Sequence, residues 1–435
     1  MSHEMIAIIA TGAMLLLMLL GLPIAVCISA TGLIGFAFMS GWDKALSLAG
    51  VMPYTSIASY TLSLLPVFLL MGEFADISGM MRDSYRAANA WLGNLPGGLA
   101  MASIFGAAAF SAVSGSSMAC AAIMTRVALP SLLEHKYSPS LATGALAAGG
   151  TLGNLIPPGI AIIFYCVITE ASIGQMLIAV LVPGIILTTM YLVQIYIQCR
   201  INPSLGPRGG STTPREKLSA FKFAVPTLVL FALVMGGIWF GIYTPNEAGA
   251  IGTVGAFIWA MARRSINGQT LIQSFKNTML TSGMAFAVVI AAQLFATFIA
   301  LSGLSHSLAS WVVGLHLSAI GVVILIMVLY FILGTAMDTL TMVLLTLPFF
   351  VPLLNAMNIN LVWFGVLVII QMELSQITPP VGLNLFVVAV MVRERGISMG
   401  TVFRGVLPFC ATMLVFNAIV IAFPQTAMWL VHQMK

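Results

Sequence analysis

The sequence LIPPG at residues 155–159 recurs as ITPPVG at residues 377–382, with the two proline pairs 222 positions apart (157 to 379). Each pair interrupts an apolar stretch that would otherwise form one membrane helix, because proline removes a backbone donor and clashes with the preceding turn. Paired breaks at corresponding places of two halves are typical of the binding sites of secondary transporters. The repeat therefore predicts a duplicated membrane protein whose site lies at the two breaks.

The composition places this chain in a membrane. Of its 435 residues, 60% are hydrophobic and only 7% are charged, whereas a soluble chain carries about 25% charged residues. Apolar segments long enough to span a bilayer recur from end to end. The first residues, MSHE and then an apolar run, lack a basic region and a cleavage site, so we expect a first span and not a removed signal peptide. The five cysteines show no CxxC spacing, which indicates neither a metal site nor a disulfide framework.

The positive charges define a topology. Residues 200–222 hold five of the seventeen Lys and Arg and form the longest polar stretch, so we expect a cytoplasmic linker there. The remaining basic groups mark further cytoplasmic ends, and only Lys44 and Lys435 fall on the outer side. This distribution explains the net charge of +5 without nucleic-acid binding and places both termini in the periplasm.

Two hairpins follow from the same charge pattern. The segment at about 97–130 is flanked on both sides by basic loops, so it is predicted to enter and leave on the cytoplasmic side, with its tip at Ser114–Ser117. The segment at about 318–354 is flanked by uncharged loops, so it is predicted to enter from the outside, with its tip at residues 337–339. Backbone of this kind at membrane depth is tolerated where protein or water satisfies it.

Each half then has five full spans and one re-entrant hairpin. The odd number of spans inverts the second half relative to the first, which predicts an all-α protein with about ten full spans and an inverted-topology repeat. The first repeat covers 1–199 with its broken helix at about 141–168, and the second covers 223–435 with its broken helix at about 360–388.

The breaks and tips offer complementary chemistry. Free carbonyls at a broken helix suit a cation, and free N–H groups suit a carboxylate. The tips add hydroxyl, backbone and carboxylate oxygens without thiolate or imidazole, a set that suits a hard cation. Small residues could serve helix packing alone, but two such clusters opposite two breaks favour binding sites.

The carboxylates within apolar segments divide into three cases. Asp338 at the second tip is predicted to bind a cation or a hydrogen-bond donor. Glu73 and Asp76 could form a solvated or salt-bridged helix end. Glu373 could be a proton site, a hydrogen-bonded group or a packing partner, and the sequence does not choose between them. No Lys or Arg lies at membrane depth, so an anionic substrate would be bound by N–H groups, hydroxyls, amides and bound cations.

The chain resembles the large membrane (M) subunit of tripartite ATP-independent periplasmic (TRAP) transporters over essentially its whole length. The most specific matches are FSAVSGSS at 110–117, AGGTLG at 148–153 followed by IPP at 156–158, MDT at 337–339 and ITPPVGLN at 377–384. The resemblance implies an elevator-type carrier of the ion transporter superfamily, with a scaffold and a mobile domain that holds the hairpins and broken helices. It also implies sodium-driven uptake of organic acids, such as C4-dicarboxylates or sialic acids, across the bacterial inner membrane.

The resemblance further implies partners and ligands. The expected partners are a small (Q type) membrane subunit and a periplasmic (P type) substrate-binding protein, with two or more transported sodium ions and no organic cofactor. The expected sodium ligands are Ser114, Gly115, Ser117, Gly150, Thr151, Gly153, Asp338, Thr341, Thr378 and Gly382. The expected substrate-binding residues are Ser116, Asn154, Pro158, Thr339, Pro380 and Asn384. After the first tip this chain has Met118 and Cys120, where many relatives carry small residues.

Other functions fit less well. A stand-alone ion-coupled carrier of the same superfamily, without a binding protein, is the nearest alternative. An intramembrane aspartyl protease would need a second aspartate facing Asp338, and a serine protease would need a histidine near Ser114 or Ser116. Since neither pattern is present in the sequence, an enzyme is not predicted, and two hairpins from opposite sides favour alternating access over a channel.

Overall fold

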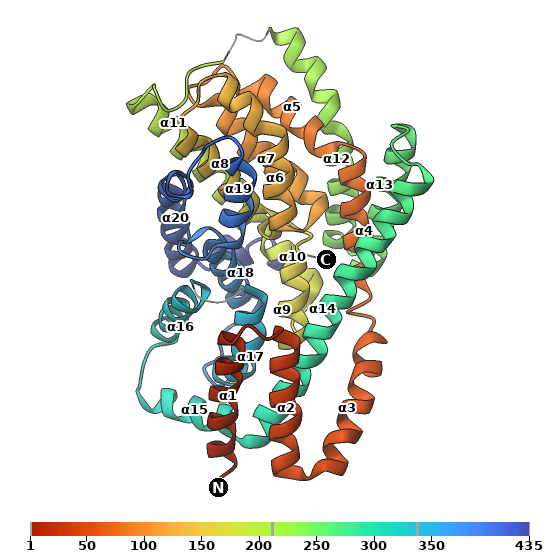
Figure 1. The fold of residues 1–435 in the computed structure, drawn as a ribbon, viewed down its shortest axis with the longest axis vertical. Helices are drawn as coiled ribbons and strands as arrows, with labels where there is room; N and C mark the ends of the chain where they lie inside the picture. The colour runs from red at the N-terminus through yellow and green to blue at the C-terminus, as the bar shows by residue number, and fades with distance from the viewer. Residues whose placement is uncertain (1, 210–212, 336–338, 435) are drawn as a thin grey trace.

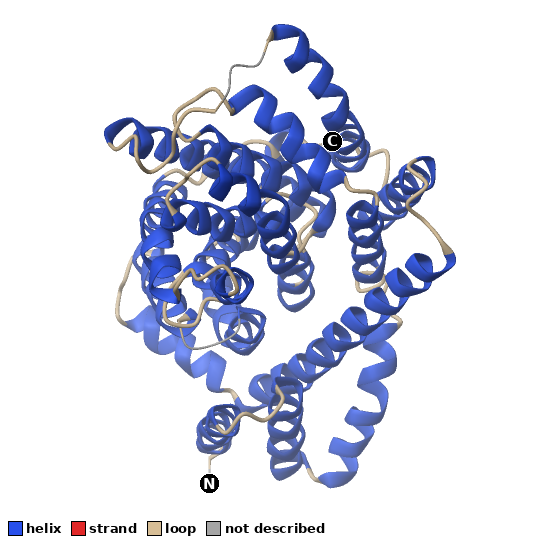
Figure 2. Ribbon diagram, turned by 45° about the horizontal axis from the view of Figure 1, so that its top comes forward, coloured by secondary structure: helices blue, strands red, loops and turns tan. Residues whose placement is uncertain are grey.

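The computed structural model of the chain describes residues 2–209, 213–335 and 339–434. Within these ranges it contains helices and no β-strand, which confirms the all-α prediction (Figures 1 and 2). The first half contains α1 (His3–Leu19), α2 (Ile24–Ser40), α3 (Trp42–Ile57), α4 (Leu64–Ile77), α5 (Met80–Leu92), α6 (Gly98–Ser114), α7 (Ser117–Glu134), α8 (Pro139–Leu155), α9 (Ile160–Thr169), α10 (Ile173–Ala179) and α11 (Leu181–Ile201).

The helices of the second half follow, and some of their bounds correspond to those of the first half. It contains α12 (Pro214–Trp239), α13 (Pro245–Ala262), α14 (Gly268–Ser302), α15 (Leu304–Gly314), α16 (Ala319–Gly334), α17 (Thr339–Ala356), α18 (Leu361–Ile377), α19 (Leu383–Arg393), α20 (Met399–Ala422), α21 (Gln425–Met428) and a 3-10 turn (Val431–Gln433). α17 begins 222 residues after α7 (117 to 339), and α18 begins and ends 222 residues after α8 (139 to 361 and 155 to 377). One difference stands out, because the single 35-residue α14 lies where the first half has both α3 and α4.

Both broken helices end where the prolines require it. α8 stops at Leu155 and α18 stops at Ile377, and the next residues, Ile156 and Thr378, are extended with ψ of 115° and 123°. A residue directly before proline is pushed out of the helical region by the proline ring, so each helix must end at that point. The Pro157–Pro158 and Pro379–Pro380 bonds are both cis.

The helix lengths and composition identify a multi-pass membrane protein. Five of the described helices are long and apolar enough to cross a bilayer, and counting two bent pairs as single spans gives seven. The pairs are α4 with α5, bent by 62°, and α8 with α9, bent by 43° at the first proline break. Large apolar side chains on α12 and α14 face outward, for example Val229 and Met279, as expected for lipid-facing surfaces. The number of about ten full spans stays a prediction.

Elements of the two halves pack together around the breaks. α9 packs against α17, and α19 packs against α7 and α8. α8 and α18 also contact each other, and both are buried at every position over Leu141–Leu155 and Val362–Ile377. Figure 1 shows α7, α8 and α19 side by side, with α14 running diagonally past α2. The center of the molecule is therefore built jointly by the two halves.

Candidate functional site

The first hairpin tip lies directly on the first proline break. Only Gly115 and Ser116 join α6 to α7, and Gly115 has a positive φ of 64° that a side chain would rarely adopt. The Ile160 N–H, at the start of α9, donates to the Gly115 carbonyl at 3.2 Å. A Cβ at Gly115 would overlap the Pro158 carbonyl, so glycine is needed for this contact.

Two glycines of α8 allow the tip to approach its backbone. A Cβ at Gly153 would lie 2.6 Å from both Cα and N of Ser117, closer than real contacts allow. A Cβ at Gly150 would lie 2.6 Å from Cβ of Ala121 and 3.1 Å from the Ser117 carbonyl. These glycines therefore place the first residue of α7 against the last two turns of α8.

A carboxylate from the second half completes this cluster. Glu373 on α18 is fully buried, and the Ser117 hydroxyl donates to it at 2.8 Å from each of its oxygens. The Asn154 amide donates to Glu373 Oε1 at 2.7 Å and to the Ser117 hydroxyl at 2.9 Å. The Gln376 amide donates to Glu373 Oε1 at 3.0 Å. Ser117, Asn154, Glu373 and Gln376 form a polar cluster, which we call the central cluster, that joins both halves.

Asn384 lies beside the central cluster and is fully buried. A Cβ at Gly150 would lie 3.1 Å from Nδ2 of Asn384 and 3.1 Å from the Ser117 carbonyl oxygen. Neither Oδ1 nor Nδ2 of Asn384 has a hydrogen-bond partner among the described residues. A buried amide without partners is rare in native proteins, because the lost hydrogen bonds to water are not replaced. Asn384 is thus available for a ligand.

The second tip and break are described in part. Asp338 lies outside the described residues, and Thr339 is described only by its backbone at the start of α17. Thr341 is buried, and the Thr378 hydroxyl donates to the Leu374 carbonyl at 2.7 Å. A Cβ at Gly334, the last residue of α16, would overlap Ser375 on α18, so the second hairpin also packs closely on its broken helix.

The other predicted residues lie around these features. The Ser116 hydroxyl accepts from Ala119 N at 3.4 Å and so caps α7. The Thr151 hydroxyl donates to the Ala148 carbonyl and lies 3.4 Å from the Tyr191 hydroxyl. Ser114 and Pro158 are buried, Gly382 has a φ of 36° beside the Gln376 and Thr378 carbonyls, and Pro380 is exposed. The structure thus gathers Ser117, Gly150, Gly153, Asn154 and Asn384, and directs the side chains of Ser116 and Thr151 to local hydrogen bonds.

Of the three roles that the sequence left open for Glu373, the structure shows a hydrogen-bonded group, and the sequence assigned no role to Gln376. One signal was available: Glu373 is the only charged residue between positions 339 and 392. An ionisable group isolated in so long an apolar stretch is a functional candidate by default.

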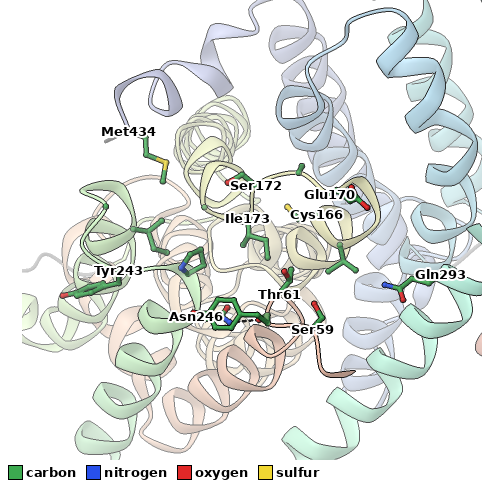
Figure 3. Close-up of a pocket in the computed structure, with 17 residues that line it drawn as sticks. Ser59, Thr61, Cys166, Glu170, Ser172, Ile173, Tyr243, Asn246, Gln293 and Met434 are labelled. Atoms are coloured by element: carbon green, nitrogen blue, oxygen red, sulfur yellow. Dashed lines mark hydrogen bonds between the residues drawn. The ribbon is translucent and has the colours of Figure 1, made fainter. Parts of the chain in front are cut away.

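Other cavities of the molecule differ in the charge of the residues that line them. A cavity of about 570 Å³ is lined by Ser59, Glu170, Tyr243, Asn246 and Gln293, among others, and by no Lys or Arg (Figure 3). Two neighbouring cavities of about 440 and 500 Å³ share Asp76 and Arg82, and one or the other also includes Arg86, Arg126 and Arg263. The cavity without Lys or Arg lies at the loops predicted to be periplasmic, and the two cavities lined by arginine lie at those predicted to be cytoplasmic.

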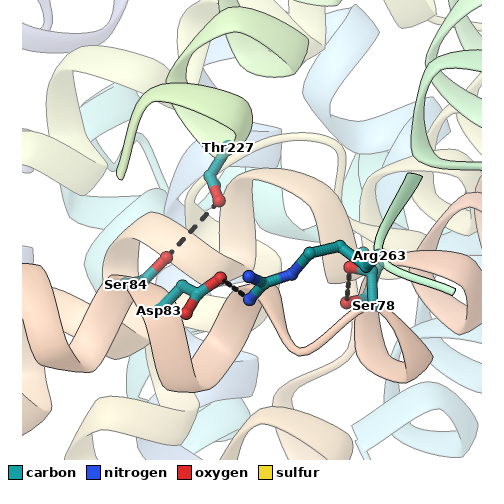
Figure 4. Close-up of polar contacts among 6 residues, drawn as sticks. Ser78, Asp83, Ser84, Thr227 and Arg263 are labelled. Carbon is teal, nitrogen blue, oxygen red and sulfur yellow. Dashed lines mark hydrogen bonds and ion pairs between the residues drawn. The ribbon is translucent and has the colours of Figure 1, made fainter. Parts of the chain in front are cut away.

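The basic region also holds the ion pair that the described residues form. Arg263, which follows α13, pairs with Asp83 of α5, and Ser84 of α5 contacts Thr227 of α12 at 3.4 Å (Figure 4). These contacts fix α5 to the first two helices of the second half. Of the two carboxylates expected at a solvated or salt-bridged helix end, Glu73 accepts a hydrogen bond from Asn277 at 3.1 Å, and Asp76 lines both basic cavities together with Arg82.

The ligand groups that the central cluster offers suit a small hard cation. They are a hydroxyl, a carboxylate and side-chain amides, all of which offer oxygen. In the ranges that the structure describes, no group of three or more His, Cys, Asp or Glu could hold a metal ion, so a transition-metal centre is not indicated there. The unpartnered Asn384 oxygen and the Ser117 carbonyl would add ligands of the same kind.

Comparisons with known proteins identify the family. Residues 11–426 match the family model described as "Tripartite ATP-independent periplasmic transporter, DctM component". The chain is 33% identical, over 89% of each chain, to the C4-dicarboxylate TRAP transporter large permease protein of Pseudomonas aeruginosa. It is 30% identical to the sialic acid TRAP transporter large permease protein of Vibrio cholerae, over 85% of this chain and 86% of that one.

A solved structure supports the fold alone. The YdaH transporter of Alcanivorax borkumensis superposes with a TM-score of 0.64 at 16% identity, over 88% of this chain and 89% of that one. Since the family model covers nearly the whole chain, the chain belongs to the DctM family, the large membrane subunits of tripartite ATP-independent periplasmic transporters.

Proposed function

We propose that this chain carries a small organic acid into the cell by sodium-coupled secondary transport. The observation that carries the proposal is the central cluster, where a hairpin tip, two broken helices and the unpartnered Asn384 meet. It offers oxygen ligands for a cation beside free polar groups for a carboxylate. Two relatives are named for carboxylate substrates, C4-dicarboxylate and sialic acid, which is consistent with this substrate class.

The substrate would lie between the two breaks. Asn384 and Asn154 would bind it by their amides, together with Ser116, Thr339 and the backbone next to Pro158 and Pro380. The sodium ligands would come from Ser114–Ser117 with Gly150–Gly153, and from Asp338–Thr341 with Thr378–Gly382. Because no Lys or Arg is part of the central cluster, the bound cations would supply the positive charge that an anion needs.

The mechanism would be that of an elevator with an inverted repeat. The repetition of helix bounds at 222 residues supports the duplication, and the charge pattern supports the opposite orientation of the halves. The hairpins and broken helices would move together against a scaffold that includes α14. The linker at 200–222 would lie on the cytoplasmic side of the inner membrane, and both termini would lie on its periplasmic side.

The energetics favour such coupling. One net positive charge crossing 100 mV releases about 2.3 kcal/mol. Two sodium ions with a monoanion carry one net charge, so the potential alone would concentrate substrate roughly 50-fold. The sodium gradient would add to this.

Reconstitution tests the proposal. The chain would be placed in liposomes with a small Q type subunit, and a P type binding protein loaded with a labelled organic acid would be added outside. We expect uptake that needs both an inward sodium gradient and the binding protein. Uptake that ignores both would refute the TRAP-type mechanism, and uptake that needs sodium but not the binding protein would favour a stand-alone carrier.

Asn384→Ala tests the site within the same assay. We expect lower uptake at unchanged protein abundance, because both polar atoms of Asn384 are free for a ligand. Gly283→Ala on α14 is a matched control, since a Cβ there meets no atom within 4 Å. Unchanged uptake kinetics in Asn384→Ala would remove this residue from the site.

A further inference from the structure

The buried carboxylate of Glu373 lacks a counter-charge in the structure. It is fully buried, and among the described residues it forms no ion pair with Lys, Arg or His. Burying an ionised carboxylate is costly unless the charge is paired and hydrogen-bonded. Within a membrane protein such a group therefore indicates a bound ion or a proton.

The neighbours of Glu373 are arranged for an ionised carboxylate. The Ser117 hydroxyl, the Asn154 amide and the Gln376 amide all act as donors toward it. Hydrogen bonds from neutral donors to a carboxylate favour its charged form. An ionised carboxylate then needs a counter-charge, and no Lys, Arg or His of the described ranges pairs with it.

The hydrogen bonds are also distributed unequally over the two oxygens. Oε1 accepts from Asn154 and Gln376 and shares the Ser117 hydroxyl, whereas Oε2 has only that shared contact among the described residues. A carboxylate oxygen has two lone-pair directions. Oε2 therefore keeps acceptor capacity on the side of Ser117.

A second observation points to a ligand at the same place. The Asn384 side chain is fully buried and unpartnered among the described residues, and it lies with the Ser117 carbonyl around the bare Cα of Gly150. Both polar atoms of this amide are available to a ligand there, and Nδ2 is the one that lies nearest to Gly150. Glu373, which lacks a counter-charge, and Asn384, which lacks hydrogen-bond partners among the described residues, therefore both lie beside Ser117.

We propose that Glu373 supplies the negative charge of a sodium site that Ser117 and Asn384 complete, and that the coupling ion binds there between the two halves. This inference rests on the sodium-coupled transport proposed above and gives one role to Glu373, for which the sequence left several open. Carboxylate, hydroxyl and amide oxygens are ligands suited to a hard monovalent cation. The remaining Asn384 Nδ2 donor is free for an oxygen of the substrate carboxylate, so one amide would contact both cation and substrate.

The arrangement explains how binding of the ion could govern the hairpin. Ser117 is the first residue of α7, Glu373 belongs to α18 and Asn384 belongs to α19. A cation held by all three fixes the first tip to both parts of the second broken helix. Without the cation, Oε2 and Asn384 would be unsatisfied, which favours opening of the tip to water.

A binding measurement tests the inference independently of uptake. The full chain, purified with its small subunit, would be melted at increasing sodium concentration with potassium chloride keeping ionic strength constant. We expect sodium to raise the melting temperature of the unaltered protein. In Glu373→Gln, which keeps the shape but removes the charge, we expect the sodium midpoint to rise at least about 10-fold, because the direct attraction between carboxylate and cation is lost.

Two further variants complete the design. Glu394→Gln makes the same chemical change at an exposed position after α19, and its sodium midpoint should equal that of the unaltered protein. Asn384→Leu removes the free amide without breaking a hydrogen bond present in the structure, so it serves if Glu373→Gln does not fold, and its midpoint should also rise.

The outcomes separate the two proposals. If the unaltered protein responds to sodium and Glu373→Gln has the same sodium midpoint, this site is overturned and Glu373 is a hydrogen-bonded acid. If Glu373→Gln does not fold, an unchanged midpoint in Asn384→Leu has the same meaning. An unaltered protein whose melting and uptake both ignore sodium refutes the proposed function itself. A raised midpoint in the variants, with the Glu394→Gln control unchanged, supports the site.

Discussion

Gly153→Ala should damage the central cluster without removing any polar group. The new Cβ would lie 2.6 Å from Cα of Ser117, whereas ordinary contacts begin at 3.4 Å, so the tip must retreat by about 0.8 Å (3.4 minus 2.6). A retreat of that size along the Ser117–Glu373 hydrogen bond would lengthen it from 2.8 to about 3.6 Å, which is no longer a hydrogen bond. Overpacking of this kind costs about 1–3 kcal/mol, against a gain of at most about 1 kcal/mol in helix propensity.

The assay is the sodium-dependent melting of the purified chain together with uptake in liposomes. We expect Gly153→Ala to melt at a lower temperature and to need more sodium for half-maximal uptake. Gly283→Ala, in the interior of α14, adds the same methyl group in open space and should melt at the same or a slightly higher temperature. If Gly153→Ala matched the unaltered protein in both measurements, the close approach of tip and broken helix would play no part in binding.

Three further predictions concern the surrounding framework. Gly72→Val should lower uptake at unchanged abundance, because even a Cβ at Gly72 would lie 2.9 Å from the Ser114 carbonyl at the first tip; equal uptake would show that α4 does not support the tip. Arg263→Gln should destabilise the protein by about 1–2 kcal/mol, since it leaves the carboxylate of Asp83 unpaired while the arginine is partly exposed, and thermal unfolding measures this. Asn267→Ala should cost about 1 kcal/mol in the same measurement, because Asn267 caps α14 by accepting from the Thr270 N–H at 2.8 Å, whereas Asn267→Asp should keep most of the stability.

The breaks and tips could be predicted from local sequence because their causes are local. Proline at positions 157 and 379 ends α8 and α18 within two residues, and SGSS at 114–117 includes the glycine that turns the chain between α6 and α7. The interruption between α3 and α4 was not predicted, since residues 58–63 contain neither proline nor glycine and the corresponding part of the second half is a continuous helix.

The partners of Glu373 could not be predicted for a different reason. Ser117 is 256 residues away along the chain and Asn154 is 219 residues away. No periodicity or spacing in the second half specifies which groups of the first half contact Glu373, because those contacts depend on how α7, α8 and α18 pack. The free amide of Asn384 was predicted as a substrate ligand, but its lack of a protein partner became visible only in the structure.

The helix bounds have a consequence for the charge that the two halves bring to the central cluster. At the separation of 222 residues, Asn154 corresponds to Gln376, and both amides donate to the same oxygen of Glu373 (154 to 376). Glu373 itself corresponds to Thr151 (151 to 373), so the carboxylate occurs in one copy and a neutral hydroxyl in the other. A carboxylate at both positions would place two like charges on α8 and α18, which contact each other. Because both positions belong to one chain, a carboxylate can stand at one and a neutral hydroxyl at the other, which two identical separate subunits could not provide.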